Sequence, residues 1–116
     1  MRIGFFVAFW LTLSFATPLM AHHGWGGYDV ANPVTVEGKI TTVKFENPHA
    51  TITVETSEKT WTVILAPTSR MISRGASPEL IAVGQPIAAY GYPSRSDEAE
   101  MRAERITVDG KTIELR

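Results

Sequence analysis

The sequence predicts a small all-β fold, a five-stranded OB-like barrel with one short helix. Three observations support this prediction. From residue 34 onward, short segments alternate between apolar and polar residues, as strands with one buried face do. The first of these segments is long and bent. One helical segment separates the third strand from the fourth, which is the order expected of an OB-type barrel. Another small antiparallel barrel or sandwich would share the alternation and is the alternative.

The bend is predicted within the first strand, which begins at Val34. Its apolar residues include Ile40 and then Val43, so the apolar side changes parity between them. A β-bulge or sharp bend over residues 38–42 explains the change, because one extra residue turns all later side chains to the opposite face.

The remaining elements are short and are separated by turn residues. Pro67 suits the first position of a helix and Gly75 suits its end, so we expect the helix over residues 67–74. Asp109-Gly110 is a two-residue hairpin turn that tolerates positive φ. The other strands are expected over residues 50–56, 60–65, 87–92, 101–108 and 111–115.

Residues 1–21 have the features of a secretory signal peptide. Arg2 supplies a positive charge, residues 3–15 are almost wholly apolar, and Ala21 is a small residue suited to cleavage. The apolar run is shorter than the ~20 residues that span a bilayer. Cleavage after Ala16 and an uncleaved membrane anchor are the alternatives. We therefore expect a periplasmic or secreted protein with a Gly-rich arm at 22–33 and the barrel at 34–116.

Composition excludes several classes of function. Loss of Arg2 leaves ten basic and twelve acidic residues, a net charge of −2, and no basic field that favours nucleic acid. The absence of cysteine excludes thiolate metal sites and cysteine nucleophiles. No Ser/His/Asp set is evident, so we do not expect an enzyme, although a copper-dependent oxidase or oxygenase stays open.

Three histidines are the candidate metal ligands: His22, His23 and His49. Cleavage after Ala21 makes His22 the first residue, with an α-amine whose pKa is about 8. This amine and the His22 imidazole can chelate one metal, and a second imidazole completes the T-shaped nitrogen set called a histidine brace. Cu(II) favours such tetragonal nitrogen sites, and Zn or Ni is a further possibility.

The second imidazole has two candidate sources. His49 follows Pro48 in a turn and is better placed for a brace, while His23 is adjacent and its geometry is awkward. A different mode uses the amine, the deprotonated amide of residue 23 and the His23 ring. Asp29 or Glu46 could add an oxygen ligand. Histidines in an arm or a turn are also common without any role.

Aromatic residues offer a second kind of site. Trp25 and Tyr28 are expected to attach the arm to the barrel, with ligand stacking or shielding of a metal as the alternative. Tyr90 and Tyr92 flank Gly91 on one face of a strand. They are a possible ligand platform.

Several motifs together resemble a known pattern. They are A-H-H followed by an aromatic residue at 21–25, V-x-G-x-I at 36–40, N-P-H at 47–49, a Trp-containing strand around 61, R-G at 74–75, V-G-x-P-I at 83–87 and D-G-K at 109–111. The chain thus resembles a family of small, uncharacterised exported bacterial proteins. This resemblance implies export and places the arm histidines and the N-P-H turn in one pattern. The expected terminal histidine also resembles that of periplasmic copper carriers and copper polysaccharide monooxygenases.

The sequence therefore favours a periplasmic metal-binding protein, a copper carrier or buffer, whose partner is the metal ion, with another periplasmic protein as a further candidate partner. The alternative function is a metal-free OB-like binding or interaction module for a sugar, peptide or envelope protein.

Overall fold

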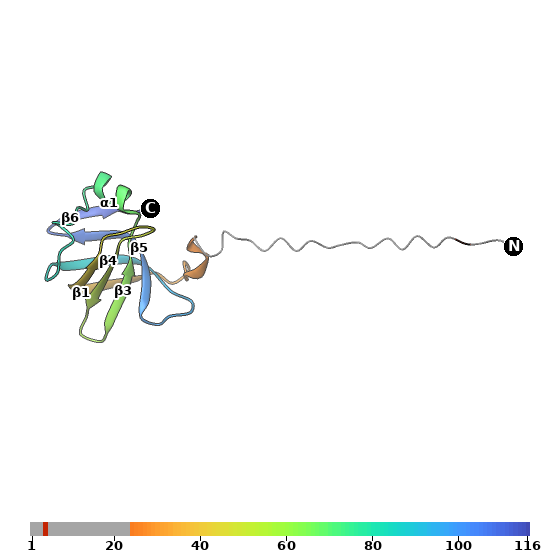
Figure 1. Ribbon diagram of the computed structural model, residues 1–116. Helices are drawn as coiled ribbons and strands as arrows, with labels where there is room; N and C mark the ends of the chain where they lie inside the picture. The colour runs from red at the N-terminus through yellow and green to blue at the C-terminus, as the bar shows by residue number, and fades with distance from the viewer. Residues whose placement is uncertain (1–3, 5–23) are drawn as a thin grey trace.

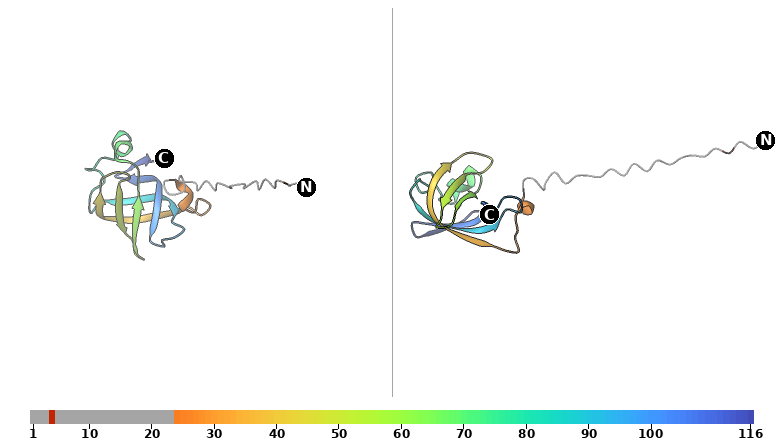
Figure 2. Two further views of the ribbon diagram at one scale, coloured as in Figure 1. Left: turned by 45° about the vertical axis from the view of Figure 1, so that its right-hand side comes forward. Right: turned by 90° about the horizontal axis from the view of Figure 1, so that it is seen from below.

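The computed structural model describes residue 4 and residues 24–116, and its strands curl into a closed barrel with a short helix beside one end (Figures 1 and 2). The elements in chain order are the 3-10 helix η2 Trp25–Gly27, β1 Val34–Lys44, β2 Thr51–Glu55, β3 Thr60–Ile64, α1 Thr68–Ser73, β4 Pro86–Pro93, β5 Glu100–Val108 and β6 Lys111–Glu114.

The sheet order is β3-β2-β1-β4-β5-β6. Neighbouring strands in this order are antiparallel. A parallel pairing of β3 with β5 then joins the two ends of the five-stranded sheet. Strands β1 to β5 therefore form the barrel, and β6 extends β5 as a hairpin. This arrangement confirms the predicted all-β, OB-like barrel with one short helix.

The first strand has the predicted bulge. Ile40 pairs with Val54 but Thr42 pairs with Thr53, so Thr41 is the extra residue. Gly38 lies where a β-carbon would overlap the backbone of Glu55. The long strand can bend and take part in two sides of the barrel because of these two features.

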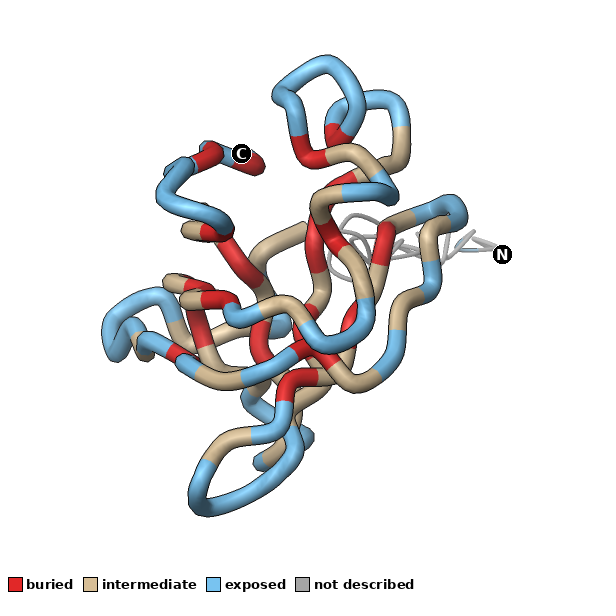
Figure 3. Tube along the Cα trace, turned by 90° about the vertical axis from the view of Figure 1, so that its left-hand side faces the viewer, coloured by how far each residue is buried: buried red, intermediate tan, exposed pale blue. Residues whose placement is uncertain are grey.

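The core fills the barrel with aliphatic side chains that come from every strand. Buried positions alternate with half-buried and exposed ones along the strands (Figure 3), as β2 illustrates with Ile52 and Val54 buried. Trp61 was expected in the core, and it is half-buried and packs against it. The largest fully buried side chains are Ile40, Ile52, Leu65, Met71, Ile81, Met101, Ile106, Val54, Val63 and Val108.

The helix and the last turn also agree with the sequence pattern. Helix α1 follows Pro67, and Gly75 has a φ of 89° just beyond its end. Asp109 and Gly110 both have positive φ in the β5–β6 turn, at 50° and 73°. No helix within the described residues is long and apolar enough to cross a membrane.

Strands β4 and β5 approach so closely at Gly91 that we expect Gly91→Ala to destabilise the barrel. A β-carbon there would overlap the carbonyl oxygen of Arg102 and the Cα of Ala103. Separating the two strands should lower the free energy of unfolding by about 2 kcal/mol or more. Gly26→Ala is the matched control, because a β-carbon at Gly26 meets no atom within 4 Å. Urea unfolding measures both variants, and equal losses would contradict the close approach.

Candidate functional site

The N-terminal arm is attached to the barrel by backbone hydrogen bonds. Tyr28 forms an isolated antiparallel bridge with Ser94. The amide of Asp29 donates to the carbonyl of Pro93 at 2.9 Å, and the amide of Arg95 donates to the carbonyl of Gly27 at 2.9 Å. The arm thus lies along the β4–β5 loop, which begins at the end of β4.

Side chains reinforce this attachment at what we call the arm-docking cluster: Trp25, Tyr28, Tyr92, Arg102 and Arg116. The Trp25 ring meets Tyr92 edge to face, with 5.6 Å between ring centroids and an interplanar angle of 84°. The guanidinium carbon of Arg102 lies 4.2 Å from the Trp25 ring centroid, and that of Arg116 lies 5.0 Å away. Trp25 therefore anchors the arm, as the sequence predicted.

Tyr28 binds a carboxylate of β5. Its hydroxyl donates to Oε2 of Glu100 at 3.0 Å. Burial, helped by this hydrogen bond and by the Glu100 charge, raises the pKa of Tyr28 to about 12. An acidic residue at position 100 suggests a solvated loop carboxylate, but Glu100 begins β5 and is half-buried. The sequence contains no signal for this contact.

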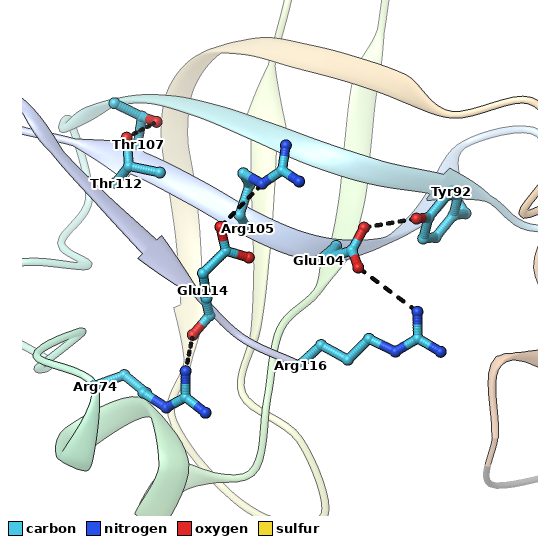
Figure 4. Close-up of polar contacts among 8 residues, drawn as sticks. All are labelled: Arg74, Tyr92, Glu104, Arg105, Thr107, Thr112, Glu114 and Arg116. Carbon is cyan, nitrogen blue, oxygen red and sulfur yellow. Dashed lines mark hydrogen bonds and ion pairs between the residues drawn. The ribbon is translucent and has the colours of Figure 1, made fainter.

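Glu104 links the other tyrosine of the cluster to the C-terminal arginine (Figure 4). The Tyr92 hydroxyl donates to Oε2 of Glu104 at 2.6 Å, while Oε1 of Glu104 lies 3.6 Å from Nη1 of Arg116. The hydrogen bond to Glu104 raises the pKa of Tyr92. Both tyrosine hydroxyls of the cluster are thus held by carboxylates of one strand.

Tyr90 and Tyr92 meet edge to face rather than side by side. Their ring centroids are 6.3 Å apart with an interplanar angle of 66°. Tyr92 is only 9% exposed, and the guanidinium of Arg105 covers Tyr90 at 4.4 Å. Arg105 is itself held by Glu114, as Figure 4 shows, with a 3.1 Å contact. The two rings offer little free face for stacking.

His49 lies between β1 and β2 and is half-buried. Its Nε2 is 3.4 Å from Nη2 of Arg102. Because arginine only donates, Nε2 accepts this hydrogen bond. His49 also lines a hollow of about 280 Å³ together with Glu46 and Thr51. Glu46, one predicted oxygen donor, therefore shares a hollow with His49.

The other predicted ligands have different positions. His22 and His23 lie outside the described residues. The Asp29 carboxylate accepts hydrogen bonds from the amide of Ala31 at 3.3 Å and the side chain of Asn32 at 2.8 Å. Within residues 24–116, no three His, Asp or Glu side chains are grouped to hold a metal. The described residues supply at most part of a metal site.

The N-P-H turn has a structural function that the sequence did not indicate. Oδ1 of Asn47 accepts hydrogen bonds from the amide and the hydroxyl of Thr68, at 3.2 and 3.0 Å. The Asn47–Pro48 peptide bond is cis. Asn47 therefore satisfies an amide at the start of α1, and it does so from 21 residues away in the chain.

Arg102 is the central charged group of the cluster and was not predicted. It is half-buried, and its Nε is buried without a hydrogen-bond partner in the described structure. Burial lowers the pKa of Arg102, and the positive charges of Arg70 and Arg116 add to this effect against the opposing influence of Tyr28. Arg70 and Arg116 thus lie close enough to Arg102 to affect its charge, and Arg116 shares the Trp25 ring with Arg102.

Comparison with known proteins places the chain in a family. A family of unknown function, DUF6152, matches residues 11–102. The chain belongs to DUF6152. The part matched by DUF6152 includes His22, His23 and the N-P-H turn.

The curated proteins contain no match to this DUF6152 chain. Among solved structures, it is similar to a chain of the S. pombe Stn1–Ten1 complex, with a TM-score of 0.54 and 15% identity. The similarity covers 66% of this chain and 57% of that chain. At this identity the likeness shows the OB-type fold alone.

Removing the Asn47 acceptor should weaken the start of α1. Asn47→Ala leaves the Thr68 amide without its partner, so we expect the free energy of unfolding to fall by about 1 kcal/mol. Asn47→Asp keeps an oxygen acceptor and should retain most of the stability. Thermal and urea unfolding of the two variants measure this difference; equal stability of Asn47→Ala and the unaltered protein would contradict the contact.

Tyr28 should titrate at an unusually high pH for a tyrosine. Its pKa is near 10 in the unfolded chain and about 12 in the folded protein, so stability should fall as pH rises from about 10 to 12. Ultraviolet titration should show one phenol that ionises near pH 12, and Tyr28→Phe should remove it. Tyr90→Phe is the control. If Tyr28→Phe instead removed a phenol that ionises near pH 10, the buried contact of Tyr28 with Glu100 would be refuted.

Proposed function

We propose that this DUF6152 protein is an exported metal-binding protein, a copper carrier or buffer, whose metal is held by His22 and His49. The observation that carries the proposal is the docking of the arm beside His49. Trp25 packs on the guanidinium of Arg102, and the same guanidinium contacts His49. A single side chain thus separates the arm from the candidate ligand.

The length of the arm fits this arrangement. An extended chain covers about 3.5 Å per residue, so the three steps from Trp25 to His22 span at most about 10 Å. The Arg102 guanidinium lies 4.2 Å from the Trp25 ring centroid and 3.4 Å from Nε2 of His49, so one guanidinium group is the gap that this reach has to cross. Cleavage after Ala21 would then supply an α-amine and an imidazole within reach of His49.

The hollow at His49 supports an oxygen ligand as well. Glu46 lines it, although its carboxylate also lies 3.7 Å from Nζ of Lys44. An imidazole and a carboxylate from one turn are a partial donor set, which the amine and ring of His22 would complete. Copper is favoured over zinc or nickel because amine and imidazole nitrogens suit the tetragonal geometry of Cu(II).

Copper titration of the exported protein tests the proposal. Mass spectrometry first establishes its initial residue. Electron paramagnetic resonance should then show one Cu(II) site rich in nitrogen. A glycine added ahead of His22 should weaken binding roughly 100-fold or more, since the loss of even an outer partner of a metal ligand costs ~10–100-fold.

Two variants separate the possible ligand sets. His49→Gln keeps an acceptor for Arg102 but should change the spectrum if His49 is a ligand, whereas His23→Gln should do so if the amide mode operates. Ile64→Val alters the same hollow without removing a proposed ligand or a charge and should have little effect. Unchanged copper affinity after both the glycine addition and His49→Gln would overturn the proposal.

The second candidate function is a metal-free periplasmic module that binds a sugar, peptide or envelope protein. The observation that favours it is the gathering of aromatic rings and arginines at the arm-docking cluster. Such a module would keep its binding after His49→Gln and lose it when Tyr92 of this cluster is changed to Ala.

A further inference from the structure

Three arginines from separate parts of the chain lie in one region, and two of them contact Trp25. Arg70 belongs to α1, Arg102 to β5, and Arg116 follows β6. Arg102 and Arg116 both lie over the Trp25 ring, and Nη1 of Arg70 donates to the carbonyl of Leu115 at 3.1 Å. Backbone and ring contacts therefore hold the three guanidinium groups in one region.

Carboxylates balance only part of the positive charge of this region in the described structure. Among residues 24–116 the ion pairs are Lys44–Glu46, Arg105–Glu114 and Arg116–Glu104. Neither Arg70 nor Arg102 takes part in one. Glu100 and Glu104 lie two residues before and after Arg102, and their carboxylates accept from Tyr28 and Tyr92 instead. Two guanidinium groups thus lack an anionic partner.

Arg102 also has an unused donor. Its Nε is buried and makes no hydrogen bond, while Nη2 contacts His49. A buried N–H without an acceptor is costly, and an acceptor that reached it would recover that free energy. Guanidinium groups bind oxyanions through paired N–H donors, and several of them together favour an anion with more than one negative charge.

We propose that Arg70, Arg102 and Arg116 form a binding site for a phosphate dianion, either free phosphate or the phosphate group of a larger molecule. The oxygens accept from the Nε of Arg102 and from the neighbouring guanidinium groups, beside the Trp25 ring. This site goes beyond the proposed metal site and does not depend on it, because none of its donors is a metal ligand.

Phosphate titration of the metal-free protein tests the site. The Nε–H resonance of Arg102, assigned by its loss in Arg102→Lys, should shift and saturate as inorganic phosphate is added. Calorimetry gives the affinity. A second titration with glycerol phosphate distinguishes the sources: equal affinity means that the phosphate group alone is recognised, and binding of inorganic phosphate alone means that the free ion is the ligand.

Variants of the two exposed arginines locate the site without removing the half-buried Arg102. Arg70→Gln and Arg116→Gln should each weaken phosphate binding about tenfold, as expected for one charge-assisted hydrogen bond. Arg105→Gln is the matched control. It removes the same charge from β5, where Arg105 already pairs with Glu114, and should change the affinity less than about twofold.

Three outcomes would overturn the proposal. The first is an Arg102 resonance that does not respond to phosphate in a saturable manner. Arg105→Gln could weaken binding as much as the other two variants, which would indicate a general effect of net charge. Unchanged affinity in folded Arg70→Gln and Arg116→Gln would place the bound anion elsewhere.

Discussion

A short parallel pairing between β3 and β5 closes the barrel, and it also assembles the candidate site. Its three residue pairs join Thr62 to Glu100, Val63 to Met101 and Ile64 to Arg102. The last pair places Arg102 beside Ile64, which lines the same hollow as His49. Closure of the sheet therefore brings the arginine next to a histidine that lies 53 residues earlier in the chain. Without that closure, the residues that line the hollow would not lie next to those that form the arm-docking cluster.

Strand β5 serves both the core and the arm because its side chains alternate between two faces. Met101 and Ala103 are buried in the barrel. On the other face, Glu100 accepts from Tyr28, Arg102 stacks on Trp25, and Glu104 accepts from Tyr92. The three side chains of this outer face therefore contact the arm or the tyrosine on which it packs. This row of side chains therefore adds to the backbone hydrogen bonds that hold the arm on the barrel.

Local pattern was sufficient to predict the barrel but not the contacts at its surface. The parity change in β1, the Asp109-Gly110 turn and the helix after Pro67 are each visible within a few residues, because they follow from backbone sterics and alternation. Asn47 and Thr68 are 21 residues apart, and nothing in either segment indicates the other. Arg102 likewise occupies an ordinary outward position of a strand. The sequence placed His49 in a turn, yet its neighbour could be found only from the closed fold.

The contact between Arg102 and His49 sets an electrostatic condition on any metal at this place. A guanidinium cation beside the imidazole opposes a divalent cation bound there, and the opposition is stronger because Arg102 is half-buried. An anion held by the arginines would reduce it and would also draw Arg102 away from Nε2 of His49. If both ligands bind, linkage requires that each raises the affinity for the other by the same factor. Under the two proposals together, metal binding at His49 would be weakest in the absence of anions, because an anion bound by the arginines would offset their charge.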